Sequence, residues 1–66
     1  MIIIRDANGI TVKYKDSLDS IRIGVMLTYV TGVDGERKIL HTNHKPHNEY
    51  TIGELESLLC LHIKRP

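Results

Sequence analysis

The sequence predicts an α+β fold, in which a four-stranded antiparallel sheet made of two β-hairpins is followed by one C-terminal helix (ββββα). Two turn sequences, at residues 8–9 and 34–35, are Asn-Gly and Asp-Gly and separate runs rich in β-branched residues, a pattern typical of hairpins. Residues 51–66 instead carry apolar side chains at helical spacing. A chain of 66 residues has the size of one small domain, so we expect a single domain over residues 1–66.

Two registers are possible for the first hairpin. A two-residue loop at residues 8–9 would place Ile4 opposite Lys13, whereas a three-residue loop at residues 7–9 would place Ile4 opposite Val12. Because neighbouring residues of a strand point to opposite faces, only the second register gathers the apolar residues on one face, and we favour it. That face would hold Ile2, Ile4, Ile10, Val12 and Tyr14.

The second hairpin begins with residues 21–30, where apolar side chains alternate with others, and this pattern predicts one long strand. The side chains expected on its core face are Ile21, Ile23, Val25, Leu27 and Tyr29. A three-residue turn at residues 33–35 would pair Tyr29 with Ile39 and Leu27 with His41. His41 would then lie on the face of the sheet that contacts the core.

The predicted helix, residues 51–66, begins with a recognisable cap. Thr51 suits the N-cap position, and Glu54, three residues later, completes a capping box. Gly53 is unfavourable inside a helix and costs about 1 kcal/mol relative to alanine. The stripe expected to contact the sheet is formed by Ile52, Leu55, Leu58, Leu59, His62 and Ile63, with the His62 ring as semi-apolar filler.

A homodimer is expected from the small size of the chain and from its apolar sheet. Domains of this size often add a disulfide, a metal or a second subunit, and Cys60 is the only cysteine, so no disulfide can form within the chain. The third predicted strand, residues 21–30, is apolar on both faces, and one helix does not easily cover both of them. Exposed strand edges also invite pairing with another chain.

The charge balance and the apolar runs exclude several classes of protein. Nine Lys and Arg residues face eight Asp and Glu residues, whereas a general polyanion binder would be much more basic. The apolar run at residues 1–4 has no basic region before it and does not resemble a signal peptide. No apolar stretch approaches the roughly 20 residues of a membrane span, so we expect a cytoplasmic protein with no membrane partner.

Three histidines at even spacing, His41, His44 and His47, suggest a metal site, but the local geometry argues against one. Pro46 prevents a helix that would align them, and residues three apart in a strand point to opposite faces. Structural zinc also prefers four ligands, often thiolates. We therefore expect a solvated loop without a bound metal, and a metal-stabilised domain is a remote alternative.

Enzyme activity and a cofactor are not expected. The sequence has no glycine-rich loop of the kind that cradles phosphate and no serine in a nucleophile-elbow context. Cys60 and His62 are two residues apart, and such residues do not share a helical face, so the imidazole could not activate the thiol directly. A chain of 66 residues is also too short to enclose a substrate easily.

Two surfaces are candidates for a binding role. Carboxylates and one aromatic side chain gather around the expected start of the helix, and tyrosine is favoured at protein interfaces. The candidate partner-binding residues are Glu49, Tyr50, Glu54 and Glu56. Basic residues are expected on one sheet face, where they could contact phosphates. The candidate nucleic-acid-binding residues are Arg5, Lys13, Arg22 and Lys38.

Our hypothesis from the sequence is a small, non-enzymatic protein-interaction module that regulates or inhibits a larger cytoplasmic protein. A nucleic-acid-binding regulator that uses the basic sheet face is the alternative. In plan alone, two hairpins and one capped helix resemble the small phage proteins that inhibit host enzymes, including the uracil-DNA glycosylase inhibitors. This plan suggests that a phage or mobile element encodes the chain, and no motif transfers a residue role.

Overall fold

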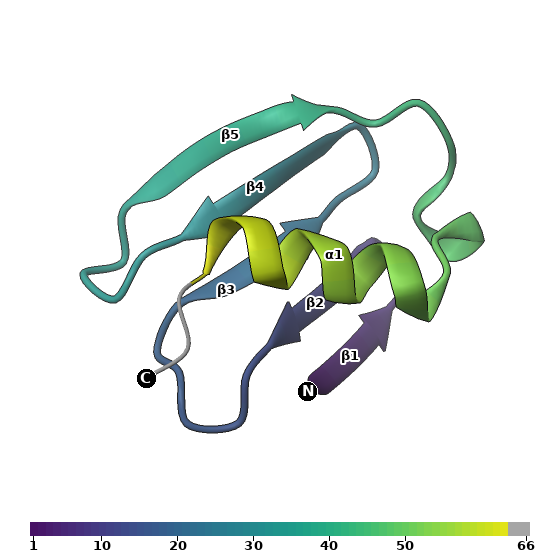
Figure 1. The fold of residues 1–66 in the computed structure, drawn as a ribbon. Coiled ribbons are helices and arrows are strands. Elements are labelled where there is room, and N and C mark those ends of the chain that lie inside the picture. Colours follow the sequence, from purple (N-terminus) through teal and green to yellow (C-terminus); the bar gives the residue numbers. More distant parts are fainter. Residues whose placement is uncertain (64–66) are drawn as a thin grey trace.

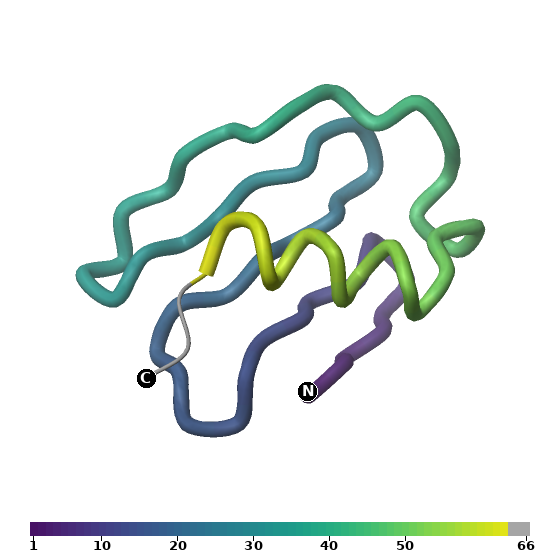
Figure 2. The backbone as a smooth tube through the Cα atoms, viewed as in Figure 1, coloured from purple at the N-terminus to yellow at the C-terminus, as the bar shows by residue number. Residues whose placement is uncertain are grey.

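A computed structural model describes residues 1–63 and shows an antiparallel sheet with one helix across it (Figure 1). The strands pair with their sequence neighbours in the order β1-β2-β3-β4-β5. The chain therefore crosses the sheet from one edge to the other and then returns over it as the helix (Figure 2). The elements are β1 (Ile2–Asp6), β2 (Gly9–Lys13), β3 (Ser20–Ile23), β4 (Leu27–Thr31), β5 (Arg37–Thr42), the 3₁₀ turn η1 (His47–Glu49) and α1 (Ile52–His62).

The sheet has five strands where the sequence predicts four, because the long strand expected at residues 21–30 is two strands. A tight turn separates β3 from β4, and the Gly24 amide donates to the Leu27 carbonyl at 2.8 Å. A Cβ atom at position 24 would lie 3.2 Å from that carbonyl oxygen, so glycine allows the two strands to approach closely.

After this turn, the residues of β4 point to the opposite faces from those expected, whereas Ile21 and Ile23 of β3 keep the expected core face. Ile21 lies opposite Val30 and Ile23 lies opposite Thr28, and residues directly opposite each other share a face. Thr28 is fully buried, whereas Val25 and Leu27 are exposed. The prediction that Val25, Leu27 and Tyr29 face the core is therefore wrong, and Thr28 and Val30 take the core side.

The first hairpin adopts neither of the two predicted registers. Ile3 lies opposite Val12 and Ile4 opposite Thr11, which leaves a two-residue loop at residues 7–8. The Asp6 carboxylate accepts the Asn8 amide at 2.8 Å and so closes this turn. As a result Ile3 is half-buried on the core side, while Ile2 and Ile4 are exposed on the opposite face.

The second hairpin turn is confirmed. Tyr29 lies opposite Ile39, and Gly35 has a φ of 85° in the left-handed conformation that a three-residue loop requires. A β-bulge next to Tyr29 then shifts the register, so that His41 lies opposite Thr28 and not opposite Leu27. Because Thr28 is buried on the core side, His41 faces the helix side as expected.

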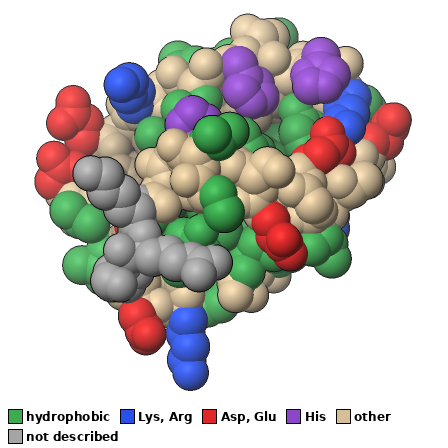
Figure 3. Space-filling view, in the orientation of Figure 1, with side chains coloured by type: hydrophobic (Ala, Val, Ile, Leu, Met, Phe, Trp, Pro, Cys, Tyr) green, Lys and Arg blue, Asp and Glu red, His purple; other side chains and the backbone are tan. Residues whose placement is uncertain are grey.

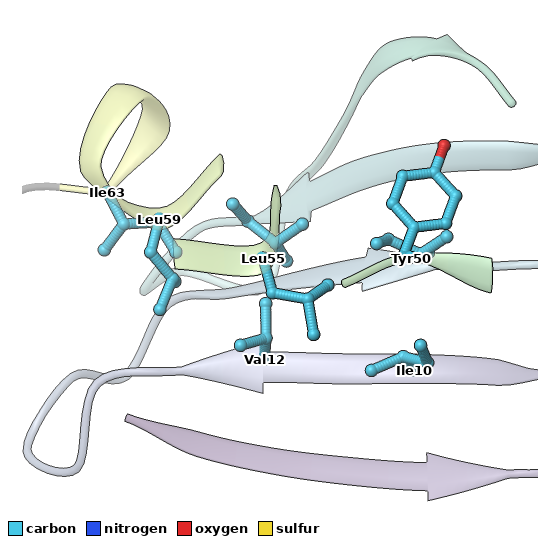
Figure 4. Close-up of a cluster of buried hydrophobic side chains, with 8 residues drawn as sticks. Ile10, Val12, Tyr50, Leu55, Leu59 and Ile63 are labelled. Carbon is cyan, nitrogen blue, oxygen red and sulfur yellow. The ribbon is translucent and has the colours of Figure 1, made fainter. Parts of the chain in front are cut away.

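The core lies between α1 and the strands β2 and β3, with α1 mainly over β2. Its buried hydrophobic residues are Ile10, Val12, Ile21, Ile23, Tyr50, Leu55, Leu59 and Ile63. Figure 4 shows Leu55 and Leu59 of the helix, and Ile63 directly after it, directed at the strands. Ile52 and His62 were expected in this contact, but both are exposed, so their assignment to the stripe is wrong.

The start of α1 is confirmed at the predicted N-cap. Thr51 and Glu54 form both hydrogen bonds of a capping box, which satisfies amide groups that the helix itself leaves unpaired. The described helix ends at His62, and the last three residues of the helix predicted over 51–66 lie outside the described residues. Within residues 1–63, no helix reaches the length and apolarity that a membrane crossing requires.

Candidate functional site

A groove separates α1 from the end of β5 and the loop that follows it. Its volume is about 440 Å³, which lies within the range of known ligand sites. His41, His44 and Tyr50 line it from β5 and the loop, and Gly53, Leu58 and Leu61 line it from the helix. Histidine side chains gather beside hydrophobic ones over this part of the surface (Figure 3). We call this hollow the α1–β5 groove.

The helix wall of the groove is open and carries two leucines beside the polar residues Glu54 and Ser57. Leu58 is half-buried, and Leu61, three residues further along the helix, is 76% exposed. Gly53 adds no side chain, and a Cβ atom there would contact only the Thr51 hydroxyl oxygen, at 3.9 Å. Apolar surface is therefore available on the helix beside an unfilled space.

Tyr50 contributes an unusual polar group to the groove. The residue is only 5% exposed, and its buried hydroxyl has no hydrogen-bond partner among residues 1–63. Figure 4 shows the hydroxyl directed away from the Ile10 and Leu55 side chains. A buried polar group without a partner costs about 1–3 kcal/mol. The fold therefore keeps an unsatisfied donor in the wall of a groove.

Two loop side chains lie against the Tyr50 ring. The Lys45 Nζ atom is 4.9 Å from the ring centroid, and the His44 ring centroid is 6.2 Å away with the planes tilted by 57°. These contacts fix the loop after β5 to the core residue Tyr50. They also bring a cation and an imidazole to the edge of the groove.

The charges beside the groove compensate each other. The Lys45 ammonium donates to both Glu54 carboxylate oxygens, at 2.7 and 2.6 Å. This hydrogen bonding, followed by the Thr51 amide of the capping box, lowers the pKa of Glu54 to about 2. Glu54 is therefore ionised at neutral pH, and its partner Lys45 balances it.

The four predicted partner-binding residues do not form one acidic patch. Glu49 is exposed at the end of η1, whereas Tyr50 is buried and Glu54 is paired with Lys45. Glu56 is exposed on the other flank of the helix, in a separate hollow that it shares with Cys60. Tyr50 belongs to the core and does not expose its ring at the surface, where an interface tyrosine was expected.

The four predicted basic residues also do not share one face. Lys13 and Arg22 lie on the face opposite α1, whereas Arg5 and Lys38 lie opposite Ile10 and Val30 on the helix side, at the two edges of the sheet. The sequence could not show this division, because it follows from the registers of both hairpins.

Arg22 is engaged within the fold. Its guanidinium donates to both Asp6 carboxylate oxygens, at 2.7 and 3.0 Å, and to the Thr11 hydroxyl at 3.0 Å. The bond from Arg22 is the main reason that the pKa of Asp6 falls to about 2. This pair connects the end of β1 to β3 across the outer surface of β2.

The histidines divide between two hollows. His41 and His44 line the α1–β5 groove, and His47 lies with His44 in a neighbouring hollow that also includes Pro46 and Val25. Among residues 1–63, no group of three His, Cys, Asp or Glu side chains is close enough to hold a metal ion.

Sequence reasoning missed the two helix residues that define the groove. Leu61 falls outside the apolar stripe, and Gly53 weakens the helix without a turn to justify it. Both residues depart from a simple amphipathic helix, and these departures could have indicated the groove.

A comparison with protein-family models, with curated proteins and with solved structures finds no match to this chain.

Proposed function

We propose that this chain is a small, non-enzymatic interaction module that regulates or inhibits a larger protein by holding a segment of it in the α1–β5 groove. The observation that carries the proposal is the open groove with its exposed leucine, beside the buried hydroxyl of Tyr50 that has no partner among residues 1–63. Ligand sites are usually apolar hollows with a few polar groups that fix orientation. The groove has this composition on a small scale.

Leu61 is the residue through which a partner would be held most directly. Its side chain is 76% exposed at the groove, although it belongs to the helix that packs the core. Interface energy is concentrated in a few apolar and aromatic contacts that exclude water. A partner segment laid in the groove would bury Leu61 together with the half-buried Leu58.

The face of the sheet opposite α1, which we call the outer face, supports a proposal that the module is a homodimer. A row of cross-strand neighbours crosses this face, and its two ends are apolar and exposed, at Ile4 and Ile39. The row consists of Ile4, Thr11, Arg22, Tyr29 and Ile39. A second copy placed on this face would bury both ends of the row.

The dimer is tested by light scattering at micromolar concentration. We expect the mass of two chains for the unmodified protein and of one chain for Ile4→Lys combined with Ile39→Lys, because two buried lysines would lack partners. A single-chain mass for the unmodified protein would remove the dimer from the proposal.

The groove is tested by affinity capture from a lysate of the source cells, with two matched variants. Leu61→Glu places a charge in the groove, and Leu18→Glu places the same charge on an equally exposed leucine, since the two leucines are 76% and 77% exposed. We expect a partner to be retained by the unmodified chain and by Leu18→Glu but lost by Leu61→Glu. Equal retention by both variants would overturn the groove as the binding site.

A nuclease arm of the same experiment separates a protein partner from nucleic acid. Retention that resists nuclease agrees with a protein partner. Retention that nuclease and salt abolish would instead support nucleic-acid binding, since phosphate contacts are salt-dependent.

A further inference from the structure

We infer that the α1–β5 groove binds an uncharged peptide segment with a leucine-like side chain, and that a backbone carbonyl of this segment accepts a hydrogen bond from the Tyr50 hydroxyl. This inference rests on the proposed function and names the chemistry of the partner at that same site. Three properties of the groove lead to it: the leucines of its helix wall, the pairing of Lys45 with Glu54 at its edge, and the Tyr50 hydroxyl, a buried donor without a partner among residues 1–63.

The apolar wall selects an aliphatic side chain. Leu58 and Leu61 face a hollow of about 440 Å³ that no side chain of residues 1–63 fills. Burying apolar surface against these leucines is favourable and needs no directional contact. A leucine-like side chain fits this wall better than a polar one, which would lose its water without gaining a partner.

The ionic groups beside the groove favour an uncharged segment. Lys45 and Glu54 are held together by two short hydrogen bonds, and Glu54 is held further by the capping box. A charged ligand would have to compete with this pair or remain unpaired in an apolar hollow, and both outcomes are unfavourable. The ligand therefore does not bring a carboxylate or an ammonium group into the groove.

The Tyr50 hydroxyl selects a hydrogen-bond acceptor. It is a buried O–H group without a partner in residues 1–63, in a residue that lines the groove. The phenol O–H can donate one hydrogen bond. Every residue of a peptide segment carries a backbone carbonyl that can accept it. A segment that places its leucine against the helix wall brings such a carbonyl into the same hollow.

Gly53 provides clearance for the backbone of the segment. It lies in the first turn of α1, where alanine would stabilise the helix. No backbone strain or internal contact requires glycine there, because its φ is not in the left-handed region and a Cβ atom would be 3.9 Å from its nearest neighbour. The missing side chain therefore leaves room on the groove side that the fold itself does not use.

The test uses NMR titration of the ¹⁵N-labelled chain with capped pentapeptides of glycine and alanine that carry one central leucine, lysine or glutamate. We expect the leucine peptide to shift the amide signals of Gly53, Ser57 and Leu61, and the two charged peptides to leave them in place. No shift with leucine, equal shifts with a charged peptide, or shifts confined to another surface would each overturn the inference.

Two variants make the test specific, because stability and affinity should change in opposite directions. Tyr50→Phe removes the unsatisfied hydroxyl, so we expect the Tm to stay equal or rise while the affinity for the leucine peptide falls about three- to tenfold. Gly53→Ala should raise the Tm through helix propensity and weaken binding through lost clearance. Tyr14→Phe, in the separate hollow on the other flank of α1, is the matched control and should leave affinity unchanged.

Unchanged affinity in both Tyr50→Phe and Gly53→Ala would overturn the assigned contacts. The proposed function is judged separately by the capture of a partner with Leu61→Glu. If Leu61→Glu abolishes capture but the leucine peptide does not bind, the groove remains the site and the peptide chemistry is wrong. If Leu61→Glu captures the partner as well as the unmodified chain does, the proposed function fails as well.

Discussion

The two halves of the sheet differ in how they are covered. Under α1, the four residues Ile10, Val12, Ile21 and Ile23 of β2 and β3 are fully buried. On the same face of β4 and β5, Thr28 is buried, but Val30 and His41 are only half-buried and Lys38 is exposed, and every residue of β5 is exposed or half-buried. A helix about 10 Å wide covers about two strand spacings of roughly 4.8 Å. One helix therefore covers half of this sheet, and the groove lies where the cover ends.

The largest expected difference between the halves is in the free energy of unfolding. Leu55→Ala removes a fully buried side chain from the covered half, and we expect a loss of about 2–5 kcal/mol. Ile39→Ala on the outer face of β5, where the side chain is 63% exposed, should cost less than about 1 kcal/mol in the single chain. Urea unfolding measures both, and equal losses would show that the outer face at Ile39 is covered in solution.

The helix cap should have the next largest effect. Thr51 accepts the Glu54 amide at 3.2 Å, and Thr51→Ala should lower the free energy of unfolding by about 1 kcal/mol. Thr51→Ser keeps the hydroxyl and is the control that should retain most of the stability. A loss in the serine variant equal to that in alanine would show that the hydroxyl does not act as the cap.

Acid should lower the free energy of unfolding by less than the loss of the helix cap does. Both ion pairs contribute little, because solvent screens their exposed carboxylates. The pKa values of Asp6 and Glu54 fall from ordinary values of 3.8 and 4.5 to about 2. A lowered folded-state pKa stabilises the fold above the ordinary value, and this stabilisation is lost as the pH falls toward the folded-state value. We therefore expect stability to decrease between about pH 4.5 and 2.

Asp6→Asn and Glu54→Gln should each flatten this decrease in urea unfolding at pH 5, 3 and 2. Glu56→Gln is the control, since the exposed Glu56 forms no ion pair in the described part of the chain. If all three variants keep the same acid dependence as the unmodified chain, the two ion pairs do not contribute to it.

The smallest expected effect on stability is that of Leu61→Glu and Leu18→Glu. Both side chains are more than three-quarters exposed, and surface substitutions of this kind usually change the free energy of unfolding by less than about 0.5 kcal/mol. Thermal unfolding checks this result. A larger loss in Leu61→Glu alone would show that Leu61 supports the fold, and its capture defect would then have no binding interpretation.

Local chemistry in the sequence was sufficient for several elements. The capping box located the start of α1, and the Asp-Gly turn at residues 34–35 located the second hairpin. Ile10 pairs with Ile23 and Val12 pairs with Ile21, and all four residues were expected in the core. Each of these depends on residues close in sequence or on simple alternation. The four-stranded count failed because the turn at Val25 and Met26 consists of strand-forming residues, with Gly24 as its only signal.

The remaining errors depend on contacts between distant residues. The first hairpin register accompanies the pairing of Asp6 with Arg22, which are 16 residues apart, and a slip of one residue moves Ile2 and Ile4 to the outer face. The groove depends on where α1 rests across the sheet, and no pattern within the helix specifies that position. For this reason the sequence pointed to the acidic residues near Tyr50 rather than to the hollow beside it.

Site-specific photocross-linking tests the groove most directly. A benzophenone amino acid replaces Leu61 in the groove, Leu18 on a loop of equal exposure, or Ile4 on the outer face, and each protein is irradiated in a lysate of the source cells. We expect a discrete adduct with a larger protein from position 61 and none from position 18, while position 4 yields only an adduct of two copies of this chain. An adduct with the larger protein from position 18 or 4, and none from position 61, would contradict binding in the α1–β5 groove.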